Sequence, residues 1–330
     1  MNKILLIQTA YTGDVVLATP VVEKLHQFFP AAKIDFCLRK GNQDLLKGHP
    51  FINDVLVFDK KNHKLKNLFS LLFKIRKKRY DLVVNMHRFA SSGLLTGFSG
   101  AREKIGFSSN PLSFLFTKKI KHEIGSGKHE VKRNLELIEH LTDSILCRPK
   151  LYPSAEDRKF IDDLQITAPY ICIAPTSVWF TKQWPQEKWI ALIQLIPASI
   201  SIYLIGGPTD FDSCETILKI SGSANCKNLA GQLSYLQSAA LMEQASMNYV
   251  NDSAPMHFAS AMNAPVTVIY CSTVPSFGFG PLSDRFRIIE TKEILACRPC
   301  GLHGYKACPE IHFRCAQTIK ASSVYENLTF

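Results

Sequence analysis

The chain of 330 residues lacks several features that would place it in a class at once. It has no apolar run of about 18 residues, which excludes a transmembrane helix. The first apolar run, residues 4–7, is too short for a signal peptide, and no cleavage-like region follows it. Internal repeats and low-complexity segments are also absent. We therefore expect a globular cytoplasmic protein, and its length favours two domains.

Acidic residues are scarce in the first half alone. Residues 1–168 hold 28 Lys and Arg against 17 Asp and Glu, whereas residues 169–330 hold 11 of each. The densest basic runs are residues 60–66, 74–79 and 118–121. This asymmetry predicts an anionic partner, either nucleic acid, an acidic membrane surface or a phosphorylated substrate, although a solvated basic face is the alternative. The runs match no DNA-binding motif and lack regularly spaced aromatic residues, which argues against nucleic acid.

Short apolar runs alternate with amphipathic stretches along both halves. The first half predicts strands at 4–8, 34–38, 54–58 and 81–86, with helices at 19–29 and 65–78. After a polar stretch at 149–167 the rhythm restarts with strands at 170–175, 200–205, 245–250 and 265–270. This pattern is typical of parallel sheets covered by helices on both faces. We predict two doubly wound domains that face each other across a cleft, residues 1–160 and 161–330, with the tail packing back on the first domain.

The first strand leads into Thr12-Gly13-Asp14 without the G-x-G-x-x-G pattern of a dinucleotide turn. Asp14 would lie near a helix start, where an acid repels phosphate, so a dehydrogenase is disfavoured. A carboxylate at the tip of a strand is instead a candidate general base. The alternative is that Asp14 only caps its helix.

Residues 245–262 read as a strand, a tight polar turn and a helix. Asp252 or Ser253 can cap that helix, and Pro255 suits its first turn. A helix that begins at the end of a strand presents free N–H groups and a partial positive charge, which together bind phosphate well. An ordinary capped helix is the alternative.

Two further turns follow strands in the second half. The segment 174–185 offers the hydroxyls of Thr176 and Ser177 together with Lys182, whose ammonium could neutralise a phosphate. The alternative is a loop with a surface lysine. Gly206-Gly207-Pro208 closes the next strand, and Asp210 just beyond it could accept hydrogen bonds from ribose hydroxyls.

Four of the ten cysteines are clustered near the end of the chain, at Cys297, Cys300, Cys308 and Cys315. Four thiols within 19 residues, led by Cys-x-x-Cys, predict a structural zinc site, in which His303 and His312 could substitute as ligands. Reduced or paired thiols are the alternative. In either case the cluster is structural, because no basic residue is placed to activate a thiol.

Taken together, these segments resemble the bacterial ADP-heptose:lipopolysaccharide heptosyltransferases of glycosyltransferase family 9. The resemblance covers almost the whole chain and rests on the order and spacing of its motifs. They are residues 4–20 with Thr12-Gly13-Asp14, Lys182-Gln183-Trp184-Pro185, Gly206-Gly207-Pro208, Asn228-Leu229-Ala230-Gly231, Asn251-Asp252-Ser253 with His257, and Cys297-Arg298-Pro299-Cys300-Gly301. The fold this implies is GT-B, two Rossmann-like domains with the active site between them.

The resemblance implies that the second domain binds a nucleotide-sugar donor, ADP-heptose. Asp252, Ser253 and the following N–H groups would hold the diphosphate, with His257 nearby. Lys182, Thr176 and Ser177 would assist, and Asp210 would contact the ribose. Ala254 departs from the glycine that the family usually has there, and its methyl group puts the details of donor binding in question.

The resemblance also implies that the basic first domain holds the phosphorylated inner core of lipid A–Kdo. Asp14 would be the general base on the acceptor hydroxyl, and Thr12, Gly13 and Arg88 would contact the acceptor. Transfer would be a single inverting displacement without a catalytic cofactor or divalent metal. The basic helix at 65–79 would rest on the anionic cytoplasmic face of the inner membrane. A nucleotide-sugar-binding module without catalysis is the alternative.

Overall fold

The computed structural model describes residues 1–166 and 168–325, and the chain forms two compact units, Met1–Tyr152 and Pro153–Phe330. The boundary lies a few residues before the expected position at 160. Helix α5 (Ala155–Asp163) explains the difference, because it packs against α8 (Tyr235–Gln244) of the second unit. An ion pair between Arg158 and Glu243 joins these two helices.

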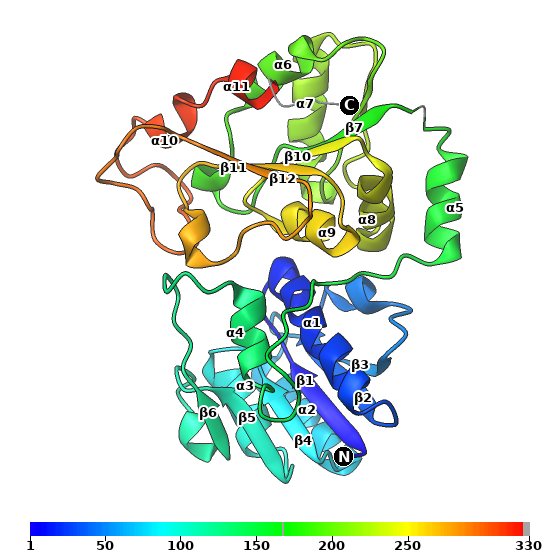
Figure 1. Cartoon of the computed structure of the whole chain (residues 1–330), viewed down its shortest axis with the longest axis vertical. Coiled ribbons are helices and arrows are strands. Elements are labelled where there is room, and N and C mark those ends of the chain that lie inside the picture. The colour runs from blue at the N-terminus through cyan, green and yellow to red at the C-terminus, as the bar shows by residue number, and fades with distance from the viewer. Residues whose placement is uncertain (167, 326–330) are drawn as a thin grey trace. The chain divides into compact units, whose positions relative to one another are not determined.

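The first unit contains a six-stranded, wholly parallel sheet in the order β3-β2-β1-β4-β5-β6 (Figure 1). Its strands are β1 (Lys3–Ile7), β2 (Lys33–Arg39), β3 (Ile52–Phe58), β4 (Leu82–Asn85), β5 (Glu103–Phe107) and β6 (Lys118–Ile120). Its helices are α1 (Thr12–Phe28), α2 (Lys64–Lys78), α3 (Ala90–Gly97) and α4 (Glu130–Glu136), with 3-10 turns η1 (Gln43–Leu46) and η2 (Ser113–Leu115).

Alternation along the buried strands divides the helices of this unit between the two faces of the sheet. Leu5 and Ile7 of β1 share an apolar cluster with Leu68 and Leu71 of α2 and with Leu95 of α3. Helix α1 packs instead with α4. Since successive strand residues point to opposite faces, α1 and α4 cover the face opposite to α2 and α3.

The second unit repeats the same topology with the order β12-β11-β10-β7-β8-β9, again all parallel. Its strands are β7 (Tyr170–Ala174), β8 (Ser201–Leu204), β9 (Cys226–Asn228), β10 (Met247–Asn251), β11 (Val266–Tyr270) and β12 (Phe286–Glu290). Besides α5 and α8, its helices are α6 (Gln186–Leu195), α7 (Phe211–Ser221), α9 (Ala254–Met262), α10 (Arg314–Gln317) and α11 (Ala321–Tyr325), with 3-10 turns η3 (Phe180–Lys182), η4 (Pro208–Asp210) and η5 (Pro275–Phe277).

Counted in chain order within each unit, both sheets have the strand order 3-2-1-4-5-6, which confirms the predicted α/β class with two Rossmann-like doubly wound units. In this order the first and fourth strands are neighbours, and the chain leaves them in opposite directions. Ligands bind at that switch point, beyond the carboxyl ends of the strands. The switch points here are β1/β4 and β7/β10.

The last described residues belong to the second unit. Helix α11 packs against α6, and Val324 is fully buried. Residues 326–330, on which part of the prediction about the tail falls, lie outside the described residues. Within the described ranges no helix is both long enough and apolar enough to cross a membrane.

Candidate functional site

The turn after β10 begins α9 as the sequence predicts, but its acid has another role. Ser253 is the N-cap residue in an extended conformation, and Pro255 lies in the first turn. Asp252 does not cap the helix. Its carboxylate forms an ion pair with Lys182 (Nζ–Oδ2, 2.6 Å) and accepts a hydrogen bond of 2.6 Å from the Thr273 hydroxyl.

The Lys182–Asp252 pair lies mostly inside the protein, with 14% and 9% of the two side chains exposed. Lys182 ends η3, which follows β7, and Asp252 follows β10, so the pair lies at the switch point of the second sheet. A lysine held by one carboxylate still has two ammonium hydrogens to donate. Next to the N-terminus of α9, this arrangement can bind a diphosphate.

Asn251, the last residue of β10, fixes the loop that carries Lys182. Its amide donates to the Pro175 carbonyl (2.8 Å), and its oxygen accepts from the Trp184 N–H (2.9 Å). Both ends of the loop are thus tied to one buried side chain. Thr176 and Ser177 lie in this loop and are partly exposed, so their hydroxyls are accessible to a ligand.

The glycine turn after β8 is built for close backbone approach. Asp210 accepts a hydrogen bond of 2.7 Å from the Gly207 N–H, which leaves its second oxygen for another donor. Gly231 has φ of +77°, and a Cβ there would lie 2.9 Å from the Pro208 Cα, so only glycine fits. His257 is buried in α9, one turn from the start of the helix.

In the first unit, Asp14 lies in the first turn of α1 and accepts a hydrogen bond from the Tyr11 N–H (3.0 Å). The Thr12 hydroxyl at the helix start donates to Asn42 (3.1 Å). Burial and the Glu130 carboxylate raise the pKa of Asp14 to about 6, against the opposing effects of the Tyr11 N–H and the Arg88 charge. Such a carboxyl is ionised at neutral pH and more basic than an ordinary aspartate, as a general base requires.

Three cations follow the carboxyl ends of other strands in the same sheet. Arg88 comes after β4, Arg39 ends β2, and Lys60 comes after β3. Lys60 donates to the Thr9 carbonyl (2.6 Å), and Arg39 lies over the Tyr11 ring at 5.2 Å. Burial and the nearby Arg39 lower the pKa of Lys60 to about 8. The edge of the sheet that carries Asp14 is therefore strongly basic.

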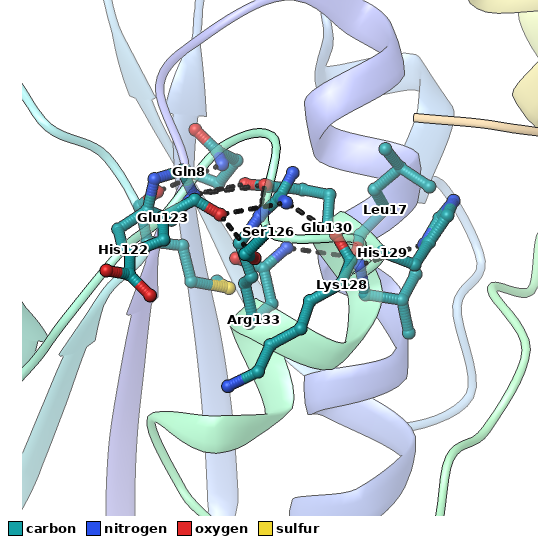
Figure 2. A network of polar contacts seen from close by, with 12 residues as sticks. Gln8, Leu17, His122, Glu123, Ser126, Lys128, His129, Glu130 and Arg133 are labelled. Carbon is teal, nitrogen blue, oxygen red and sulfur yellow. Dashed lines mark hydrogen bonds and ion pairs between the residues drawn. The ribbon is translucent and has the colours of Figure 1, made fainter. Parts of the chain in front are cut away.

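A buried ionic network supports the start of α1, and Figure 2 shows it. Glu130 in α4 accepts from Arg133 Nε (2.7 Å) and lies 3.0 Å from His122 Nε2. Arg133 also donates to the Lys128 carbonyl (2.5 Å). Asn134, one turn after Glu130 in α4, donates to the Leu17 carbonyl (3.2 Å). Leu17 is three residues beyond Asp14 in α1. This register places Glu130 near enough to Asp14 for its carboxylate to raise the pKa of Asp14.

Comparison with known proteins assigns a family to this chain. Residues 68–303 match the family described as "Glycosyltransferase family 9 (heptosyltransferase)". A lipopolysaccharide heptosyltransferase 3 of Escherichia coli strain K12 is 30% identical over 277 residues, which is 80% of this chain and 80% of that protein. The chain belongs to glycosyltransferase family 9. It is therefore a transferase.

Solved structures agree with this glycosyltransferase in fold. The E. coli ADP-heptose lps heptosyltransferase II superimposes with a TM-score of 0.81, at 24% identity over 99% of this chain and 97% of that one. The E. coli heptosyltransferase WaaC with ADP gives a TM-score of 0.76, at 18% identity over 98% of both chains. At these identities the likeness establishes the fold alone.

In this family 9 glycosyltransferase the predicted catalytic and substrate-binding residues of the first unit follow β1 and β4, and those of the second unit follow β7 and β10, except Asp210, which follows β8. Lys182 lies beside Asp252, while Thr12, Gly13 and Asp14 begin α1. The roles given to these residues remain predictions. The sequence gives no role to four further residues, because each acts on a partner distant in sequence: Asn251 on Trp184, Thr273 on Asp252, Thr181 on Tyr305 and Glu130 on Asp14.

The four clustered cysteines line one cavity of about 160 Å³ together with His312. Burial and the other thiols of the cluster raise the pKa of Cys300, and the same causes raise the pKa of Cys315 to about 11. Among the described residues, no three His, Cys, Asp or Glu side chains are arranged to hold a metal ion. The zinc site stays a prediction.

Proposed function

We propose that this glycosyltransferase moves a heptose from ADP-heptose to the phosphorylated inner core of lipopolysaccharide. The observation that carries the proposal is the buried Lys182–Asp252 pair at the start of α9, which provides a cation beside a helix N-terminus. Such a site stabilises a leaving nucleoside diphosphate. The relatives support the sugar, because proteins named lipopolysaccharide heptosyltransferase match most of the chain.

In this proposal Lys182 and the N–H groups of Ser253 and Ala254 bind the donor diphosphate. Asp252 orients Lys182, since a carboxylate would repel the phosphates themselves. Thr176 and Ser177 donate hydroxyl hydrogen bonds, and His257 lies close to the same helix end. Asp210 accepts from the ribose through the oxygen that Gly207 does not use.

On the acceptor side, Asp14 takes the proton from the attacking hydroxyl. The oxygen then forms a bond to the anomeric carbon as the bond to ADP breaks, so the configuration inverts. Thr12, Gly13 and Arg88 contact the acceptor, and the other cations of this edge favour its phosphates. Lys182 and the α9 N-terminus carry the charge of the leaving group, so no divalent metal is required.

A transfer assay paired with a thermal-shift panel tests this proposal. ADP and ADP-heptose are expected to raise the Tm of the purified protein. At a ligand concentration of about 100 times Kd, binding adds about 2.7 kcal/mol to the free energy of unfolding. Transfer to heptose-acceptor lipopolysaccharide should be detected by mass spectrometry with chelator present. A response to uridine or guanosine nucleotides alone, without one to ADP, would contradict the donor assignment.

Helix α2 suggests how the enzyme reaches a lipid-linked acceptor, and we include membrane docking in the proposal. Leu65, Phe69 and Phe73 are 68%, 50% and 70% exposed, and their spacing of four residues places them on one side of the helix. Lys66, Lys74 and Lys77 are exposed on the same helix. Exposed aromatic residues flanked by lysines are typical of helices that lie on anionic bilayers.

Lys78 has a different role from the other lysines of α2. It forms ion pairs with Asp35 (2.7 Å) and Asp54 (2.5 Å) and therefore ties α2 to strands β2 and β3. Changing Lys78 would disturb the fold as well as the surface charge. A test of membrane docking should leave it intact.

Replacing Lys66, Lys74 and Lys77 by Glu is expected to weaken binding to vesicles that contain phosphatidylglycerol. The lost attraction of about 1 kcal/mol per lysine predicts a decrease on the order of a hundredfold in a sedimentation assay. A matched variant with the same charge change on exposed lysines of the second unit should bind normally: Lys159, Lys227 and Lys320→Glu. Equal losses in both variants would show a general charge effect and dismiss α2 as the docking surface.

A further inference from the structure

The loop that carries the cysteines packs against Thr181 and the stem of the Lys182 side chain. Thr181, the residue before Lys182, is fully buried and forms hydrogen bonds with both backbone groups of Tyr305. The Thr181 N–H donates to the Tyr305 carbonyl (3.1 Å), and the Tyr305 N–H donates to the Thr181 hydroxyl (2.7 Å). These bonds link η3 to a loop more than 120 residues away in sequence.

The same loop also forms hydrogen bonds with residues 271–273, which directly follow β11. The Cys300 N–H donates to the Ser272 carbonyl (2.8 Å), and the Ser272 hydroxyl donates to Thr181 (3.0 Å). Arg298 donates through Nε to the Cys271 carbonyl (2.8 Å) and through Nη2 to the Thr273 carbonyl (2.8 Å).

Residues 298–305 therefore hold a neighbour of each partner of the ion pair. Thr273, whose carbonyl Arg298 binds, donates its hydroxyl to Asp252. Thr181, which Tyr305 and Ser272 bind, directly precedes Lys182. The loop therefore contacts Asp252 through Thr273 and the segment of Lys182 through Thr181.

Gly304 is the point of closest approach between this loop and the lysine. Its φ is +78°, and a Cβ there would lie 2.8 Å from the Thr181 hydroxyl oxygen and 3.0 Å from the Lys182 Cγ. Gly301 in the same loop has a similar φ of +61°, but the nearest atom to its Cβ would be the Tyr305 hydroxyl at 3.4 Å. Only at Gly304 does a methyl group meet the lysine.

We propose that Arg298, Cys300 and Tyr305 form a clamp that fixes the Lys182–Asp252 pair for the donor diphosphate, with Thr181 and Gly304 as positioning residues. The inference rests on the proposed function, in which Lys182 binds that diphosphate. Neither residue touches the ligand in this scheme. The clamp would act by keeping the lysine stem in one conformation, which lowers the entropy cost of binding.

Gly304→Ala and Gly301→Ala form a matched pair for the test. Both place alanine at positive φ, so they carry similar backbone strain. Gly304→Ala is expected to raise the Kd for ADP about tenfold by isothermal titration, and the KM for donor in parallel, with the KM for acceptor unchanged. Gly301→Ala should stay within about twofold of the parent. Equal Kd values for the two variants would overturn the clamp.

Thr181→Val and Thr181→Ser give an independent measurement through the hydroxyl alone. Valine keeps the shape of threonine and its backbone bond to the Tyr305 carbonyl, but it can no longer accept from the Tyr305 N–H and the Ser272 hydroxyl. ADP binding should therefore weaken, whereas serine keeps the hydroxyl and should restore it. A Thr181→Val enzyme that binds ADP normally would contradict the clamp. Thr216→Val, on the exposed face of α7, is the control for the chemical change.

Lys182→Met separates failure of this inference from failure of the proposed function. Loss of ADP affinity in Lys182→Met with normal affinity in Gly304→Ala and Thr181→Val would reject the clamp and leave the proposed function standing. Unchanged ADP affinity in Lys182→Met would reject the donor role of the lysine, and the clamp with it.

Discussion

Replacing Asp14 by Asn is expected to reduce turnover by about 10²- to 10⁴-fold, the usual contribution of a general base. Asparagine retains the oxygen that accepts from the Tyr11 N–H, so the first turn of α1 keeps its hydrogen bond. The Kd for ADP should not change, because Asp14 belongs to the first unit and the proposed diphosphate site to the second. Steady-state kinetics and ADP titration check both parts, and an unchanged kcat would reject Asp14 as the base.

The pH dependence of the parent enzyme gives a second test of the same residue. Because burial and Glu130 raise the pKa of Asp14 to about 6, the base form is lost as the pH falls through that value. The parent kcat/KM should therefore decrease tenfold per pH unit below about pH 6. In Asp14→Asn this acid limb should disappear from the residual rate. An acid limb that persists in the variant belongs to another group.

The Asp14→Asn substitution should raise the free energy of unfolding at pH 8 although it lowers turnover. A carboxyl whose pKa is raised on folding stabilises the protein below its unfolded pKa, and that contribution is lost as the pH rises through about 6. At pH 8 the ionised Asp14 therefore costs stability, and Asp14→Asn should gain about 1–2 kcal/mol after allowance for its partial exposure. Thermal unfolding at pH 8 and at pH 4 should show a gain only at the higher pH. An inactive variant that is more stable cannot owe its inactivity to misfolding.

The central strands could be predicted because they are buried on both faces and therefore read as continuous apolar runs. The strands missed lie towards the edges of the sheets, where polar residues face solvent: β5, β6, β9 and β12. Helix α1 begins at Thr12 rather than at the predicted residue 19, and Pro20 lies inside it. In the structure the Thr19 hydroxyl donates to the Val16 carbonyl (2.8 Å), the acceptor that the missing Pro20 N–H would have used.

The candidate site was predictable only as far as its local turns. The sequence identifies Lys182 and Asp252 as separate candidates, but not that one neutralises the other, because they belong to turns 70 residues apart. The segment around Glu130 and Arg133 is charged enough to suggest a solvated helix. It is buried because its charges satisfy each other and three polar groups of the loop before it. Partners of this kind are set by the tertiary fold and leave no local signal.

Arg133→Met is expected to destabilise the protein by about 3–5 kcal/mol, the typical cost of removing one partner from a buried ion pair. Both side chains are almost fully buried, at 1% exposure for Arg133 and 6% for Glu130. The variant also removes hydrogen bonds to the Lys128 and Glu123 carbonyls, so the loop before α4 loses its anchor. Urea unfolding followed by circular dichroism measures the loss. Lys128→Met, which breaks the pair between the exposed Lys128 and Glu136, should cost much less stability than Arg133→Met.

Glu130→Gln together with Arg133→Met tests whether the network also tunes the base. Removing both charges should recover part of the stability, because no ionised group is then left without its partner. The ionised Glu130 raises the pKa of Asp14, so its loss should lower that pKa and move the acid limb of kcat/KM to lower pH. A network that only supported the fold would change the unfolding curve and leave the acid limb in place. The direction of that limb therefore decides whether α4 acts on the chemistry or only holds α1.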